Sequence, residues 1–193
     1  MPIHDLISSN GAMAFARMRS GDSSWLTRLD ALSDDCRAIG LVWPGAPDVA
    51  DLAATASATL GRGRAGYLDR NPVVLPWQSI AANLVLGTDT GSDGAMAAQM
   101  LSVVGLSARG PRRPQGLAPF QVLALGLGRA MLQNPGLLII AGLHRHPAAV
   151  GQLRALTRIE AELGALTGCR RLHVVDRLPD AETFCDTFLQ LSP

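Results

Sequence analysis

The chain has 193 residues, 48% of them hydrophobic, and a formal net charge of +1 at pH 7. This length buries one sizeable core, while the nearly balanced charge argues against binding to nucleic acid or anionic lipid. The sequence contains no lysine, so all 17 basic residues are arginine. Schiff-base chemistry and the lysine of a phosphate-binding loop are therefore excluded.

Short apolar runs alternate along the chain with segments of helical spacing. The expected strands are 12–16, 39–43, 137–140, 172–175 and 187–191. The expected helices are 23–32, 94–106, 121–132, 148–166 and a short one from residue 179, while 48–60 fits either a helix or a solvated connection. This alternation is typical of an α/β layer fold with a mainly parallel sheet, and we expect one domain over residues 1–193.

Local motifs exclude several kinds of site. Gly61–Gly66 matches G-x-G-x-x-G, but a strand-like segment follows it instead of the helix that a dinucleotide site needs. His144 and His146 are close in sequence but lack a neighbouring carboxylate or cysteine at ligand spacing. We therefore expect loop histidines, no metal site, buried thiols at the three cysteines and a solvated turn at Arg170–Arg171.

Neither a secretory signal nor an apolar run of 18 residues is evident in the sequence. We therefore expect a cytoplasmic protein with no direct membrane insertion.

The segment 111–148 resembles the part of an ATP-binding-cassette (ABC) ATPase that contains the signature and the Walker B strand. In that family a Leu-Ser-Gly-Gly-Gln signature opens a helix with an Ala-Arg-Ala element, which an Asn-Pro turn and an apolar strand follow. The matching residues are Leu117, Gln121, Arg129, Ala130, Asn134, Pro135 and the run 137–140.

Three further segments resemble parts of the same family in the same order. Residues 15–32 resemble the P-loop and its helix, 66–87 the Q-loop, and 172–191 the switch segment. Leu75, Pro76, Trp77 and Asn83 are similar to the nitrate, sulfonate and taurine importer branch. The resemblance implies a P-loop NTPase-like three-layer core with a mainly parallel sheet, truncated N-terminal antiparallel strands and a helical insertion at about residues 78–115.

The resemblance also implies that the nucleotide site has lost its chemistry. The P-loop positions are Ala16, Gly21, Asp22, Ser23 and Ser24, with Asp22 in place of the lysine. The Q-loop glutamine, Walker B aspartate, catalytic glutamate and switch histidine are replaced by Arg70, Ala141, Gly142 and Asp176. The signature consists of Leu117, Ala118, Pro119, Phe120 and Gln121, in which proline removes a backbone donor and phenylalanine adds bulk.

We therefore expect a non-hydrolysing pseudo-ATPase, without cofactor or metal, that serves an ABC transport system as an accessory, structural or regulatory subunit. Its expected partner is an active ABC ATPase, a membrane permease or a second copy of itself. Its expected location is the cytoplasm, or the inner face of the plasma membrane as a peripheral protein. Two alternatives stay open: weak, non-standard ATP binding through Arg17, Arg19 or Arg70, and a stand-alone cytoplasmic scaffold or regulator. The residues Gly21–Ser24 also fit a surface turn with a helix N-cap.

Overall fold

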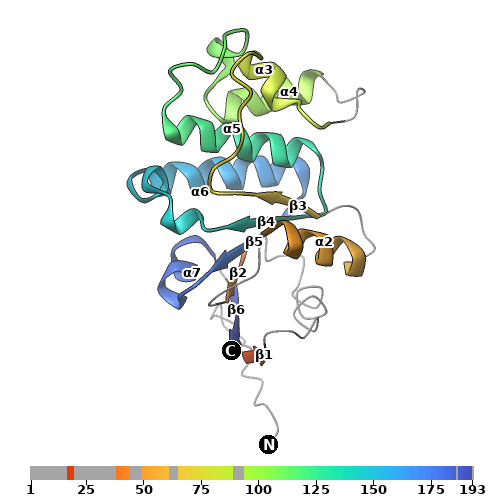
Figure 1. Ribbon diagram of the computed structural model, residues 1–193, viewed down its shortest axis with the longest axis vertical. Helices are drawn as coiled ribbons and strands as arrows, with labels where there is room; N and C mark the ends of the chain where they lie inside the picture. The colour runs from red at the N-terminus through yellow and green to blue at the C-terminus, as the bar shows by residue number, and fades with distance from the viewer. Residues whose placement is uncertain are drawn as a thin grey trace, which may run out of the picture.

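The computed structural model describes residues 17–19, 38–43, 49–60, 65–88, 94–185 and 187–192. These residues form a six-stranded sheet in the order β1-β6-β2-β5-β4-β3, in which every strand pair is parallel (Figure 1). The strands are β1 (Arg17–Arg19), β2 (Ala38–Val42), β3 (Ala65–Leu68), β4 (Leu137–Ala141), β5 (Arg170–Val175) and β6 (Thr187–Ser192). The predicted α/β class with a parallel sheet is thereby confirmed.

One face of the sheet is covered by helix α2 (Val49–Leu60). Its buried side chains Leu52 and Ala56 pack against Ile39 and Leu41 of β2, in a cluster that also includes Ile139 of β4. Because alternate side chains of a strand point to opposite faces, Ile39 and Leu41 lie on the same face of the sheet, the one that packs against α2. The segment that fitted either a helix or a connection is therefore a helix.

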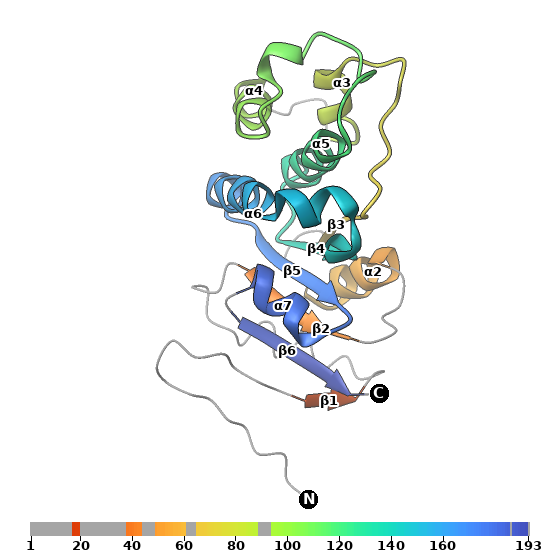
Figure 2. The same ribbon diagram turned by 90° about the vertical axis from the view of Figure 1, so that its left-hand side faces the viewer.

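The opposite face is covered by α5 (Pro119–Leu132) and α6 (Pro147–Thr167), as Figure 2 shows. Leu138 and Ile140 of β4 point into this layer, where they join the larger buried apolar cluster. A shorter helix, α7 (Leu178–Phe184), covers the ends of β2 and β5 through Ala181. The sheet is thus the middle layer of three.

A further group of short helices lies beyond α5, away from the sheet (Figure 1). It consists of α3 (Ile80–Leu84), α4 (Gly94–Val103) and the 3-10 turn η1 (Ser107–Arg109). The buried Asn83 side chain stabilises the entry to this group. Its amide oxygen accepts from the Leu75 N–H at 2.7 Å, and its amide nitrogen donates to the Ser79 carbonyl at 3.0 Å. These elements fall in the segment predicted to be a helical insertion.

The other predicted elements agree closely with the structure. Strands predicted at 39–43, 137–140, 172–175 and 187–191 correspond to β2, β4, β5 and β6, and the helices predicted after residue 94 correspond to α4, α5, α6 and α7. The expected strand 12–16 and helix 23–32 lie outside the described residues. Within the described part of the chain, no helix is both long and apolar enough to cross a bilayer.

Candidate functional site

Three of the predicted site positions meet at the carboxyl edge of the sheet. Arg70 follows the end of β3 by two residues, Gly142 directly follows β4, and Asp176 directly follows β5. Because these strands are adjacent and parallel, their carboxyl ends lie side by side. Ligands of open α/β sheets bind beyond this edge, so it is the first place to examine for chemistry.

The end of β4 has no group that binds a metal or activates water. Ala141 carries only a half-buried methyl group that packs against the α2 side of the core. Gly142 has φ +66°, a conformation that other residues adopt with strain. A Cβ built at Gly142 would lie 3.7 Å from Cδ of Arg70, so the arginine lies over this position.

Magnesium prefers oxygen ligands, and these residues do not supply them. In the ranges that the structure describes, no group of three or more His, Cys, Asp or Glu side chains is arranged to hold a metal ion. At this edge, Ala141 and Gly142 therefore supply no oxygen side-chain ligand, the carboxylate of Asp176 is paired with Arg145, and the Arg70 side chain lies near Gly142.

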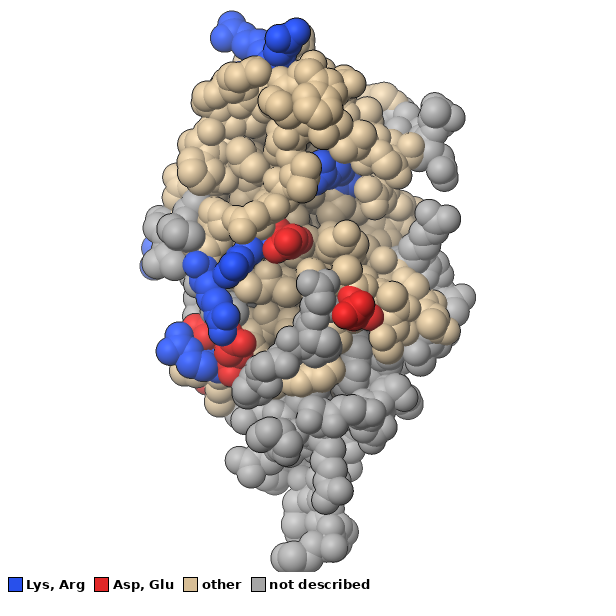
Figure 3. Space-filling view, in the orientation of Figure 1, with Lys and Arg blue, Asp and Glu red and all other residues tan. Residues whose placement is uncertain are grey.

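An ion pair joins the two loops at this edge. Arg145, in the 3-10 turn η2 (Leu143–Arg145), donates a hydrogen bond to the carboxylate of Asp176. The two side chains are 56% and 29% exposed, so the pair contributes about 0–1 kcal/mol to stability. Close by in sequence, Arg177 pairs with Asp180 at 3.0 Å, and this hydrogen bond raises the pKa of Arg177. Figure 3 shows basic and acidic side chains gathered together on this side of the molecule.

The predicted signature forms an ordinary helix start. Ala118 has extended backbone angles, and α5 begins at Pro119, a position where proline is well tolerated because no N–H partner is needed. The Gln121 side chain accepts a hydrogen bond from the Ala118 N–H at 3.0 Å and another from Arg109 at 3.3 Å. Phe120 packs against the buried core cluster, and Leu117 is half-buried beside it. Hydrogen bonds and packing contacts within this protein therefore stabilise the start of α5.

The strand order places the switch point of the sheet at a segment other than the predicted P-loop. From β2 the chain crosses to β3, returns through β4 and β5, and then passes β2 to reach β6 on its other side. The order thus reverses at β2, and the strand–loop–helix unit at this switch point consists of β2, residues 43–48 and α2.

The unit at this switch point therefore differs from the segment 15–32 that was predicted to hold the P-loop. Within the predicted loop, Arg17–Arg19 instead form β1, which pairs with β6 at the end of the strand order. The five predicted P-loop positions lie outside the described residues: Ala16, Gly21, Asp22, Ser23 and Ser24. The sequence predicted the strand 39–43, whereas 48–60 fitted either a helix or a solvated connection.

The composition of residues 43–48, WPGAPD, is unsuited to holding phosphate. Phosphate loops bind through backbone N–H groups at a helix N-terminus and through a lysine. Pro44 and Pro47 have no N–H to donate, and the segment contains no lysine. Asp48, directly before α2 in the sequence, is acidic.

A buried polar network lies deeper, between α6 and β5. Nε2 of His173 lies 2.8 Å from a carboxylate oxygen of Glu160, and Arg171 donates to the Glu160 carbonyl at 2.7 Å. All three side chains are at most 5% exposed. The expectation of a solvated turn at Arg170–Arg171 is therefore wrong, because both residues belong to β5 and Arg171 is covered by α6. His144 and His146 lie in and directly after the 3-10 turn η2, as expected of loop histidines.

The fold and the arrangement of this edge define an α/β protein of the P-loop NTPase-like class. No family model matches the chain. The chain is 32% identical over 123 residues to the aliphatic sulfonates import ATP-binding protein SsuB 1 of Streptomyces avermitilis, a match that covers 61% of this chain and 45% of that protein. It is 34% identical over 123 residues to the SsuB protein of Pseudomonas fluorescens, covering 64% of this chain and 42% of that protein.

Solved structures share the fold. One is the ATP-binding subunit of an ABC transporter, with TM-score 0.55 and 18% identity, covering 80% of this chain and 74% of that one. Another is a metal-chelate type ABC transporter in an inward-facing conformation, with TM-score 0.59 and 12% identity, covering 80% of this chain and 69% of that one. The chain is thus similar to ABC importer ATP-binding subunits, and it spans less than half the length of the curated relatives it matches.

Proposed function

We propose that the chain is a non-hydrolysing relative of ABC ATP-binding subunits that acts as an accessory or regulatory subunit of an ABC import system. The observation that carries this proposal is the end of β4, where Ala141 and Gly142 offer no oxygen ligand and Arg70 lies over Gly142. A site that must hold magnesium and position water needs the opposite charge there.

The remaining edge supports the same proposal. The loop between β2 and α2 lacks a lysine and two backbone donors, and Pro119 and Phe120 replace the small residues with which a partner's nucleotide would be held. The fold itself is retained, with a sheet covered on both faces. A retained fold without this chemistry is suited to binding protein partners, and the partner that we propose is a permease or an active ATP-binding subunit at the inner face of the membrane.

The first experiment is calorimetric titration of the purified protein with ATP, with and without magnesium. We expect no saturable heat up to millimolar nucleotide. Micromolar, magnesium-dependent binding would overturn the proposal, because Ala141 and the loop 43–48 would then have been bypassed. A parallel co-purification with membrane components should recover a permease or an active ATP-binding subunit. Recovery of no ABC component would favour a stand-alone regulator.

A second function is favoured by one specific observation, the position of Arg70 over Gly142. Arginine recognises phosphate well, so this side chain offers a route to weak ATP binding without the missing lysine. Phosphate release that persists through purification, falls in the variant Arg70→Ala and is unchanged in Arg112→Ala would establish it. Arg112 is a matched control because it is also an exposed arginine, in the turn before α5.

A further inference from the structure

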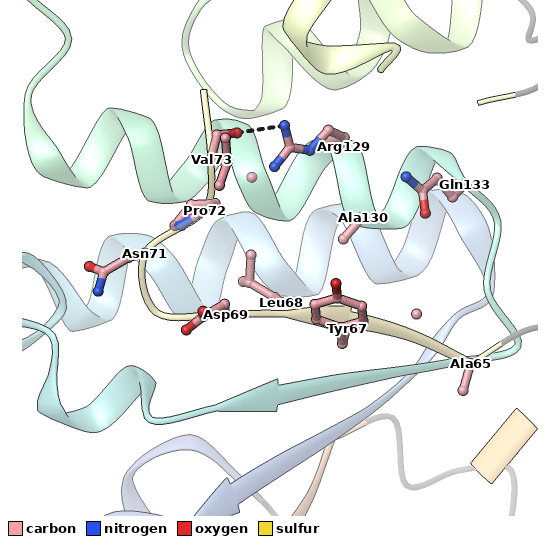
Figure 4. Close-up of a pocket in the computed structure, with 12 residues that line it drawn as sticks. Ala65, Tyr67, Leu68, Asp69, Asn71, Pro72, Val73, Arg129, Ala130 and Gln133 are labelled. Carbon is pink, nitrogen blue, oxygen red and sulfur yellow. Dashed lines mark hydrogen bonds between the residues drawn. The ribbon is translucent and has the colours of Figure 1, made fainter. Parts of the chain in front are cut away.

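A cavity lies beside the edge strand of the sheet, β3. It has a volume of about 370 Å³ and lies between β3, the segment that follows it and one side of α5 (Figure 4). Because β3 is the last strand in the sheet order, no further strand of the described residues pairs along this side. Pockets of this size suit small ligands.

Arg129 is the main charged group of this cavity. Its guanidinium projects from α5, is about half-buried and donates one hydrogen bond, to the Val73 carbonyl at 2.7 Å. Burial lowers the pKa of Arg129 below its usual value. Arg145, Arg171 and Arg177 each pair with a carboxylate, whereas Arg129 has no carboxylate partner among the described residues.

A guanidinium has five N–H donors, so a half-buried one with a single hydrogen bond retains capacity for a ligand. A partly desolvated cation is stabilised most by an anion that accepts two parallel hydrogen bonds. The geometry of the cavity therefore favours a carboxylate at Arg129.

The other polar groups of the cavity are arranged along β3 and α5. Figure 4 shows Tyr67 with its hydroxyl directed toward α5 and Gln133 directly after the end of that helix, while Asp69 and Asn71 lie toward the far end. Asp69 makes no ion pair with Arg129, so its carboxylate repels an anion in the cavity.

We propose that this cavity is a binding site for a small organic acid whose carboxylate pairs with Arg129. Arg129 already holds the segment after β3 through the Val73 carbonyl, and this segment also contains Arg70. Binding therefore stabilises the stretch that places Arg70 over Gly142. The proposal does not depend on the ABC-related function, because it rests on the cavity and on Arg129, which has no carboxylate partner in the described part of the chain.

The test is calorimetric titration of the full chain with succinate, L-glutamate and inorganic phosphate in low-salt buffer. We expect saturable, salt-sensitive binding of at least one of the two organic acids. Arg129→Gln should weaken it about tenfold to a hundredfold, because a hydrogen-bonded charge pair is lost. The matched control Arg112→Gln removes the same charge from an exposed site and should leave affinity unchanged.

Two more variants keep the test valid if Arg129→Gln does not fold. Asp69→Asn should tighten succinate binding several-fold because it removes a repelling carboxylate, and Gln133→Leu should weaken it without a change in charge. Both residues are exposed, so the fold should persist, which circular dichroism checks. Absence of saturable binding by both organic acids would overturn the proposal. An equal loss in Arg112→Gln, or preference for phosphate with no effect of Arg129, would do the same.

Discussion

Replacing Gly126 by alanine tests how the segment after β3 is seated on α5. Gly126 is buried in the middle of α5, and a Cβ there would lie 2.4 Å from Cβ and 2.6 Å from Cγ of Pro72. Contacts this short require movement, and the proline ring cannot rotate away because it is closed onto its own backbone. The substitution should therefore displace Pro72 and its neighbours from the helix.

The sign of the effect depends on two opposing contributions. Alanine stabilises a helix interior by about 1 kcal/mol relative to glycine. Overpacking of a well-packed contact costs about 1–3 kcal/mol, and the rigid proline places this site near the upper end. We expect a net loss of about 1–2 kcal/mol, which lowers the melting temperature of a domain of this size by about 2–8 °C.

Thermal and urea unfolding of Gly126→Ala, with Gly94→Ala as the matched control, measures this effect. Gly94 is the first residue of α4, and a Cβ there would meet nothing within 4 Å. The control should therefore be neutral or slightly stabilised. If Gly126→Ala were as stable as the wild type, the contact with Pro72 would not be rigid and the reasoning would be refuted.

Two further predictions concern buried ionisable groups. Glu160→Gln leaves Arg171 buried without its carboxylate and should lower the free energy of unfolding, measured in urea, by about 3–5 kcal/mol. The control Glu162→Gln changes an exposed carboxylate on the same helix and should lower it by well under 1 kcal/mol. Equal effects of the two substitutions would contradict the burial argument. Burial raises the pKa of the Cys169 thiol to about 11 from 9.0, so the stability it contributes is complete below pH 9 and is lost as the pH rises toward 11. The free energy of unfolding should fall more steeply over that range in the wild type than in Cys169→Ala, and parallel pH profiles would refute the assignment.

Much of the secondary structure could be predicted because its signals are local. The run 137–140 is continuously apolar, as a strand covered on both faces requires, and it is buried as β4. The helical spacing of 121–132 predicted α5, whose interior is almost entirely buried. The absence of particular side chains can also be read directly from the sequence. A chain without lysine, with Ala141 and Gly142 after its buried strand, lacks those side chains whatever its fold.

Strand order could not be predicted in the same way. Apolar strands resemble one another in sequence, and pairing between distant segments determines which strands are neighbours. The central position of β2 and the edge position of β1 are therefore seen only in the assembled sheet. The sequence therefore did not show that the switch point of the sheet follows β2 and not the segment 15–32. The burial of Arg171 could not be predicted either. It depends on the packing of α6 against β5, and the neighbouring sequence does not indicate it.

The cavity at Arg129 also belongs to the tertiary structure. The sequence places Arg129 in a helix that resembles a known one, but Tyr67 and Val73 are more than fifty residues away and reach it only when α5 packs over β3. Sequence alone thus determined the elements and the groups that are missing, since both depend on neighbouring residues or on covalent identity. The tertiary structure decided which strand is central, which charges are buried and where a half-buried arginine lines a cavity. These features depend on contacts between segments far apart in the chain.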